Sequence, residues 1–210
     1  QGSKTIGFEI AEQLGWKAPN HIVAPVAAGL SLWQNYQGLK ELREFGLIDD
    51  LGTRMHAVQT ATCDPVVKAW NNGNLVELNP IRNPQTSIAE TLSVGDPTNG
   101  YHVLKTLKES DGSAVSVSEE EIRFGVQLTR DHTEFAIGPV GGTTIAGLRM
   151  LINQGIINPD ETTVAVITDV YDQNGLHDGT TFSHQGKLIN IECKKEAVRK
   201  TLEAILEGTV

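Results

Sequence analysis

Residues 21–42 read HIVAPVAAGLSLWQNYQGLKEL, and the fold class follows from this stretch. It opens with an apolar run, His21–Val26, that predicts a buried strand. Small residues follow at positions 27–29, and the next apolar residues recur with helical spacing over about Ser31–Phe45. A buried strand joined to a helix by a short loop is the repeating unit of a parallel α/β fold.

The same alternation continues along the chain. Further strands are predicted at Thr53–Thr60, Ala114–Ser118 and in TTVAVIT (162–168), whose near-continuous apolar run is typical of a parallel sheet. Helices are predicted at about Ser3–Leu14, from Pro65, at Tyr101–Ser110, from Ser118 and at Thr143–Gln154. This pattern predicts the α/β class, in three layers with a mostly parallel sheet, as a single domain over residues 1–210.

Several local signals set boundaries within this pattern. Thr62 or Asp64 is a candidate cap for the helix that has Pro65 in its first turn. Ser118 with Glu121 three residues later predicts a capping box. Residues 71–100 are rich in Asn, Pro and Gly and predict a long ordered loop containing a helix near Thr86–Leu92.

Composition excludes some classes of function. The net charge is −9, which argues against nucleic acid or an anionic membrane as partner, since both require clustered cations. Two cysteines, Cys63 and Cys193, do not make a disulfide framework and favour a cytoplasmic protein. The histidines His21, His56, His102 and His132 are scattered along the chain without evident partners, so no metal site is predicted.

Three places are candidates for binding chemistry. The loop Ala27, Ala28, Gly29, Leu30 and Ser31 leads into a helix, whose free N–H groups and partial positive charge suit an anion, although the residues alone slightly favour a plain tight turn that binds nothing. GPVGGTT (138–144) also leads into a helix and is either a packing turn or a second anion site. Thr168 ends a predicted strand, where open α/β sheets place their ligands.

Five segments, in order, resemble threonine synthase. They are QGSKT…FEIAEQLGW (1–16), the loop segment 21–30, TATCDPV (60–66), TSIAETLSVGDP (86–97) and INPDET (157–162). The resemblance covers about residues 1–168 and leaves 169–210 as a divergent tail, in which a strand at Lys187–Cys193 and a helix at Lys195–Leu206 are predicted.

The resemblance implies a pyridoxal-phosphate enzyme of fold type II that converts O-phosphohomoserine and water into threonine and phosphate. It assigns the cofactor phosphate to the backbone of residues 27–31, with a hydroxyl from Ser31. It matches Thr168 to the residue that contacts the pyridine nitrogen, where a hydroxyl partner leaves the nitrogen largely unprotonated. It also implies a phosphorylated amino acid as substrate. A chain without its partner domain exposes the face that this domain covered, so a homo-oligomer is expected.

The chain departs from the family at several positions. The family's cofactor-binding lysine belongs to a Ser-Phe-Lys-Asp-type motif that is expected upstream of residue 1, and polar or small residues of the phosphate loop are replaced by Ala28 and Leu30. Three hypotheses stay open. The chain is part of a working lyase completed by an N-terminal domain or a second chain, a non-catalytic binding domain, or part of a serine or threonine dehydratase.

Overall fold

The computed structural model describes residues 2–133, 135–170, 181–184 and 187–190. The chain divides into two compact units, residues 1–169 and 170–210. The elements of the first unit are, in order, η1 (Gly2–Lys4), α1 (Thr5–Gln13), β1 (His21–Pro25), α2 (Leu30–Glu44), β2 (Arg54–Thr60), α3 (Pro65–Asn71), η2 (Glu90–Leu92), α4 (Gly100–Glu109), β3 (Ser113–Val117), α5 (Glu119–His132), α6 (Pro139–Asn153) and β4 (Thr163–Ala165).

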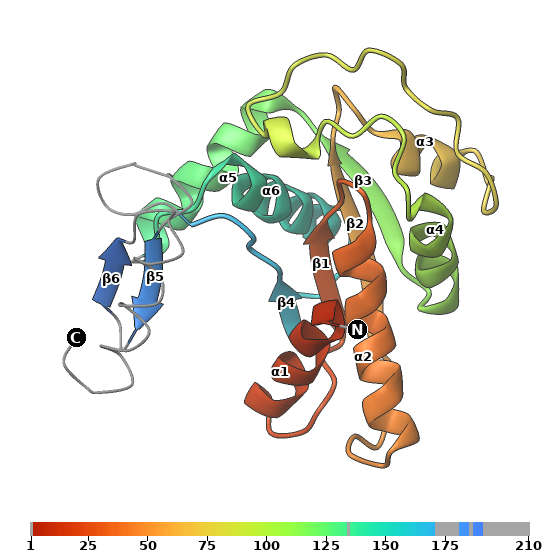
Figure 1. The fold of residues 1–210 in the computed structure, drawn as a ribbon, viewed down its shortest axis with the longest axis vertical. Coiled ribbons are helices and arrows are strands. Elements are labelled where there is room, and N and C mark those ends of the chain that lie inside the picture. Colours follow the sequence, from red (N-terminus) through yellow and green to blue (C-terminus); the bar gives the residue numbers. More distant parts are fainter. Residues whose placement is uncertain (1, 134, 171–180, 185–186, 191–210) are drawn as a thin grey trace, which may run out of the picture. The chain divides into compact units, whose positions relative to one another are not determined.

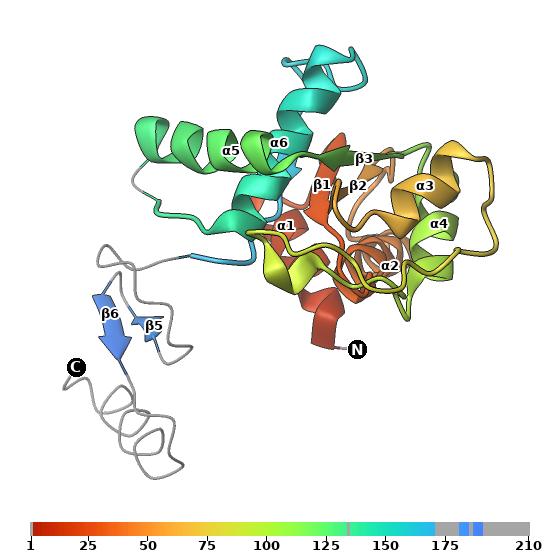
Figure 2. The ribbon, with the colours of Figure 1, turned by 90° about the horizontal axis from the view of Figure 1, so that it is seen from above.

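The four strands of the first unit form one parallel sheet in the order β3-β2-β1-β4. Helices α1, α2 and α4 cover one face and α5 and α6 cover the other (Figures 1 and 2). The three-layer α/β class predicted from the sequence is therefore confirmed. The assignment of residues 1–210 to a single domain stays a prediction.

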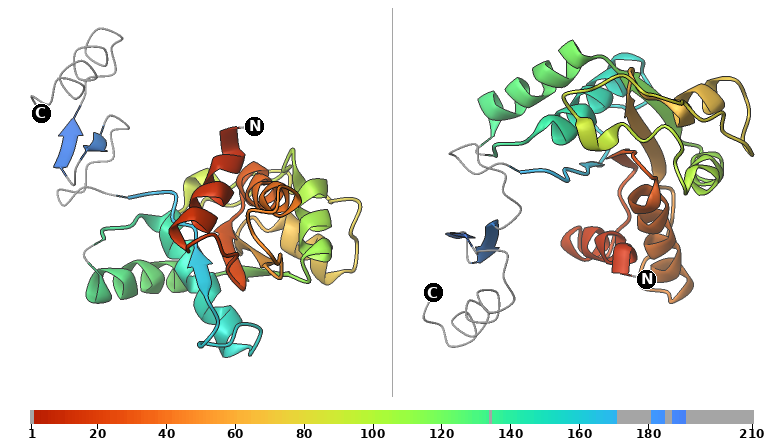
Figure 3. Two further views of the ribbon diagram at one scale, coloured as in Figure 1. Left: turned by 90° about the horizontal axis from the view of Figure 1, so that it is seen from below. Right: turned by 45° about the horizontal axis from the view of Figure 1, so that its top comes forward.

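Strand β1 supplies both hydrophobic cores because its side chains alternate between the two faces. Ile22 and Ala24 belong to the core under α1–α4, whereas Val23 belongs to the core under α5 and α6. All five residues of β1 are buried. Figure 3 shows α1 lying beside α2 on the first of these faces.

Most of the predicted elements form, with two informative differences. The strand predicted over 162–168 pairs only over Thr163–Ala165. The helix predicted near Thr86–Leu92 shrinks to the 3₁₀ turn η2. Near the start of the predicted helix, Ser87 Oγ and the backbone N–H of Ile88 both donate to the Glu119 carboxylate, at 2.6 and 2.9 Å. Because Glu119 is the first residue of α5, these donors bind α5 and do not begin a helix of their own.

The capping box is confirmed, whereas at α3 a predicted cap residue holds the N-cap position without a capping hydrogen bond. Ser118 Oγ accepts from the Glu121 N–H, and the Glu121 carboxylate accepts from the Ser118 N–H. Asp64 occupies the N-cap position of α3, but its carboxylate lies 2.8 Å from Lys68 Nζ and makes no capping bond.

The acceptor at the start of α3 comes instead from Gln59, which is fully buried in β2. Its Oε1 accepts from the backbone N–H groups of Val66 and Val67, at 2.9 and 3.2 Å. Its Nε2 donates to the carbonyl of Val26, at 3.2 Å. One amide side chain thus joins the end of β1 to the start of α3.

Two histidines that look unrelated in the sequence form a buried pair. His21 Nδ1 lies 2.9 Å from His56 Nε2, and both side chains are fully buried. The outer ring nitrogens bond Glu161 Oε2, 3.0 Å from His21 Nε2, and Ser113 Oγ, 2.7 Å from His56 Nδ1. The expectation that these histidines lack partners is therefore wrong; the parallel register, with Val23 beside His56, sets both on one face.

The second unit contains β5 (Thr181–His184) and β6 (Lys187–Asn190), paired antiparallel. Strand β6 confirms part of the strand predicted at Lys187–Cys193, and β5 lies outside the elements predicted for the tail. The predicted helix Lys195–Leu206 falls outside the described residues. None of the helices in the described ranges combines the length and the apolar character needed to cross a membrane.

We predict that His56 makes the fold sensitive to acid. Burial, with smaller contributions from His21 and Arg54, lowers the pKa of His56 from 6.5 to about 3. Between pH 6.5 and about 3, His56 binds a proton in the unfolded chain and stays neutral in the folded chain. Stability contributed by neutral His56 is therefore present above 6.5 and is lost as the pH falls toward 3, by about 1 kcal/mol per pH unit.

Urea unfolding at several pH values between 7 and 4 measures this slope. His56→Gln is expected to unfold with a shallower pH dependence than the natural chain, whereas the exposed His132→Gln keeps the original slope. Equal slopes for His56→Gln and the natural chain would contradict the assignment.

We predict that Gln59→Leu lowers the free energy of unfolding by about 2–3 kcal/mol, because it leaves buried backbone donors and an acceptor without partners. The same change at the half-buried Gln37 is the control and is expected to cost less than about 0.5 kcal/mol. Equilibrium urea unfolding gives both values. Similar losses at the two positions would show that the Gln59 bonds do not stabilise the fold.

Candidate functional site

The strand order creates a switch point beside β1. The connection through α2 carries the chain from β1 to β2, whereas the connection through α5 and α6 carries it from β3 to β4, on the other side of β1. Neighbouring connections that leave in opposite directions open a crevice outside the carboxyl ends of the strands. Open α/β sheets bind ligands there, so the edge of the sheet formed by the carboxyl ends of β1 and β4 is the candidate site.

The loop predicted to bind an anion lies at this edge. It follows β1, and α2 begins at Leu30, one residue earlier than expected. Gly29 is the N-cap residue with φ +90°, a left-handed conformation that favours glycine, and it has no side chain with which to cap the helix. The first N–H groups of α2 therefore lack a capping side chain.

Ser31 carries the clearest sign that this loop accommodates a ligand. Its Oγ atom is buried and makes no hydrogen bond to any described residue. Buried hydroxyls normally have partners. An anion at the start of α2 would supply one and would also meet the free N–H groups and the positive end of the helix. The residues present thus fit a phosphate group.

Residues that no sequence motif singled out hold the loop 27–31 in place. The carbonyl of Ala28 accepts from the backbone N–H of Asn99, at 3.0 Å. A Cβ atom on Gly29 would lie 2.5 Å from Val103 Cγ2, so α4 requires a glycine at this position. The Gln59 amide fixes Val26, where the loop begins.

The predicted site residues are distributed over two neighbouring strand ends. Ala27 and Ala28 are half-buried and Leu30 is 44% exposed, so the loop presents an open and partly apolar face. Thr168 is exposed and follows β4, the neighbour of β1. The topology therefore places residues 27–31 and Thr168 at the same sheet edge, and the roles assigned to them stay predictions.

The second candidate loop, 138–144, binds the side-chain carboxylate of Asp169. The Asp169 carboxylate accepts from the backbone N–H of Val140, at 2.9 Å, and from that of Gly141, at 2.5 Å. These groups lie in the first turn of α6. This helix end is therefore filled by an internal carboxylate, whereas the start of α2 is open.

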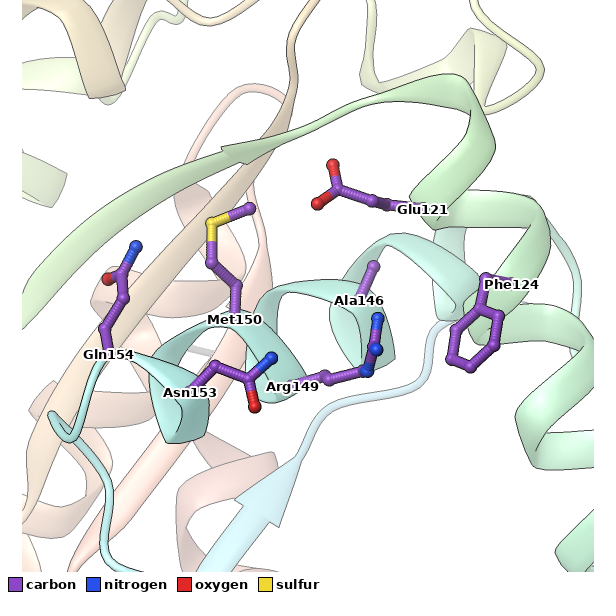
Figure 4. Close-up of a pocket in the computed structure, with 7 residues that line it drawn as sticks. All are labelled: Glu121, Phe124, Ala146, Arg149, Met150, Asn153 and Gln154. Carbon is purple, nitrogen blue, oxygen red and sulfur yellow. The ribbon is translucent and has the colours of Figure 1, made fainter.

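Other features do not belong to this site. A cavity of about 250 Å³ between α5 and the second half of α6 is lined by Glu121, Phe124, Ala146, Arg149, Met150, Asn153 and Gln154 (Figure 4). The Arg149 guanidinium lies over the Phe124 ring, 4.5 Å from its centre. Cys63 is buried, and burial raises the pKa of its thiol, so it is a poor nucleophile.

Within the described residues no cluster of three or more His, Cys, Asp or Glu side chains has the arrangement of a metal site. The side chains of His177, Asp178 and His184 are not among those described.

Comparison with known proteins gives a consistent family. A model of the family described as pyridoxal-phosphate dependent enzyme matches residues 1–169. Threonine synthase from Methanosarcina acetivorans is 36% identical over 168 residues, covering 80% of this chain and 41% of that protein. Threonine synthase from Methanocaldococcus jannaschii is 31% identical over 206 residues, covering 98% of this chain and 49% of that protein.

Solved structures show the same fold at low identity. A fungal L-serine ammonia-lyase from Rhizomucor miehei is 21% identical with a TM-score of 0.61, covering 81% of this chain and 52% of that one. The processed threonine deaminase isoform 2 from Solanum lycopersicum is 17% identical with a TM-score of 0.64, covering 82% of this chain and 46% of that one.

The match covers less than half the length of these two threonine synthases. The family match covers residues 1–169, and the parallel α/β fold with its open start of α2 at the switch point is consistent with it. The chain belongs to the pyridoxal-phosphate dependent enzyme family.

Proposed function

We propose that this chain is the cofactor-holding part of a threonine-synthase-type lyase. The observation that carries the proposal is the open start of α2, where the buried Ser31 Oγ lacks a partner among the described residues, beside uncapped backbone N–H groups. The relatives named threonine synthase, at 31–36% identity, support this activity over that of the ammonia-lyase and the threonine deaminase, whose likeness concerns the fold.

In this proposal residues 27–31 hold the phosphate of the cofactor. Backbone N–H groups at the start of α2 and the Ser31 hydroxyl donate to it, and Gly29 allows the loop to turn without a side chain in the way. Asn99 and Gln59 keep the loop in place through its carbonyl groups. Thr168 presents a hydroxyl to the ring nitrogen from the end of the neighbouring strand.

The proposed reaction converts O-phosphohomoserine and water into threonine and phosphate. When bound, pyridoxal phosphate supplies a conjugated ring that accepts electron density from the carbon atoms of the amino-acid substrate. The cofactor-binding lysine and much of the substrate site are assigned to an N-terminal domain or a second chain. We further propose a homo-oligomer in the cytoplasm, in line with the face that a missing domain would leave exposed and with the low cysteine content.

We predict that the phosphate group dominates cofactor recognition by this chain. Isothermal titration of the 210-residue chain is expected to give binding of pyridoxal 5′-phosphate at least about 10-fold tighter than pyridoxal, since a charge-assisted hydrogen bond contributes roughly 1.5–3 kcal/mol. Ser31→Ala is expected to weaken pyridoxal 5′-phosphate about 10-fold and to leave pyridoxal unchanged.

Ser3→Ala makes the same change outside the loop, in η1, and is expected to bind both ligands as the natural chain does. Equal affinity for the two ligands, or an unchanged affinity in Ser31→Ala, would refute the phosphate site. Borohydride reduction of the chain with bound pyridoxal 5′-phosphate, followed by peptide mapping, tests where the cofactor-binding lysine lies. A single labelled lysine would show that this chain supplies its own, and no label supports its placement outside the chain.

A further inference from the structure

We propose that Asp169 is a positioning residue for Thr168, holding the cofactor-facing end of β4 against helix α6. The inference rests on the proposed function in one respect only, the ring contact assigned to Thr168. The rest of the inference needs only the backbone of the sheet. Strand β4 is short, and the residues that follow it are held by α6 rather than by the neighbouring strand β1.

The ladder between β1 and β4 stops because of Pro25. His21 donates its backbone N–H to the carbonyl of Thr162, and Val166 donates to the carbonyl of Val23. In a parallel ladder alternate residues face the same neighbour, so the next donor toward β4 after residue 23 is residue 25. Proline has no N–H. The Val166 carbonyl is therefore left without its ladder donor.

Helix α6 supplies the missing bond. Thr144 Oγ1, fully buried, lies 3.1 Å from the carbonyl oxygen of Val166 and donates to it. This side chain replaces the donor that Pro25 lacks. At Val166 the chain thus changes from a hydrogen-bond partner in β1 to one in α6. This explains why strand pairing ends at Ala165 although the predicted strand continues to residue 168.

Asp169 makes the second attachment to the same helix. Its two carboxylate oxygens accept from the N–H groups of Val140 and Gly141, and its carbonyl accepts from the N–H of Gly138, at 3.4 Å. A negative charge is favourable at this end of a helix. A Cβ atom on Gly141 would lie 2.9 Å from Asp169 Oδ1, so the absence of a side chain there admits the carboxylate.

Thr168 therefore lies between two anchored residues, Val166 and Asp169, while its own side chain is exposed. A hydroxyl that is accessible yet held on both sides is suited to meeting a ring nitrogen at a fixed place. The hydrogen bonds of Asp169 go to the start of α6 and not to residues 27–31, so its effect on the cofactor is expected to pass through Thr168.

The test combines backbone dynamics with ligand binding on the 210-residue chain. Asp169→Ala is expected to raise amide exchange of Val140 and Gly141 at least about 10-fold, since each amide loses a charge-assisted bond, and to lower the NMR order parameter of Thr168. Asp169→Asn, which keeps one good acceptor, is expected to restore part of both values. Asp160→Ala removes the same charge before the opposite end of β4 and is expected to leave them unchanged.

Binding of two probes, pyridoxal 5′-phosphate and inorganic phosphate, separates the ring from the phosphate. Asp169→Ala is expected to weaken pyridoxal 5′-phosphate several-fold and to leave inorganic phosphate unchanged, because only the ring meets Thr168. An unchanged order parameter at Thr168 overturns the inference, as does equal loss of both probes. If the natural chain binds neither probe, the proposed function fails, and the Thr168 dynamics alone still support or overturn the positioning role.

Discussion

The structure depends on the complete burial of β1 between two helical layers. A strand buried on both faces must satisfy its backbone through its two neighbours, so β2 and β4 are both required beside it. Its alternating side chains supply the centres of both hydrophobic cores. Because β1 is central, its carboxyl end is also where the connections diverge and where the candidate site opens.

The position of Pro25 links this constraint to the site. A proline is tolerated in a central strand only where a ladder bond can be given up. Here it terminates pairing with β4, and the freed segment 166–169 is taken over by α6. The two helices that begin at this edge consequently differ. The start of α6 is filled by Asp169, and the start of α2 is open.

Buried polar side chains add connections between elements of the first unit to those that the backbone makes. Gln59 joins the end of β1 to the start of α3, and the pair His21 and His56 joins β1 to β2 with Ser113 and Glu161 at its ends. Each ring nitrogen and each amide atom of these residues has a partner. Such satisfied networks add specificity to the packing, since a shifted register leaves several buried groups unpaired.

Local patterns in the chain were enough to predict the α/β class, the order of strands and helices, and the small-residue loop that precedes α2, because periodicity and glycine placement are local properties. The same residues carried the family resemblance that the comparisons confirm. Which polar residues meet depends instead on tertiary structure. His21 and His56 lie 35 positions apart, and Asp169 lies 29 positions after Val140. Their bonds depend on strand register and on the crossover through α6, and neither is written in the local pattern of residues.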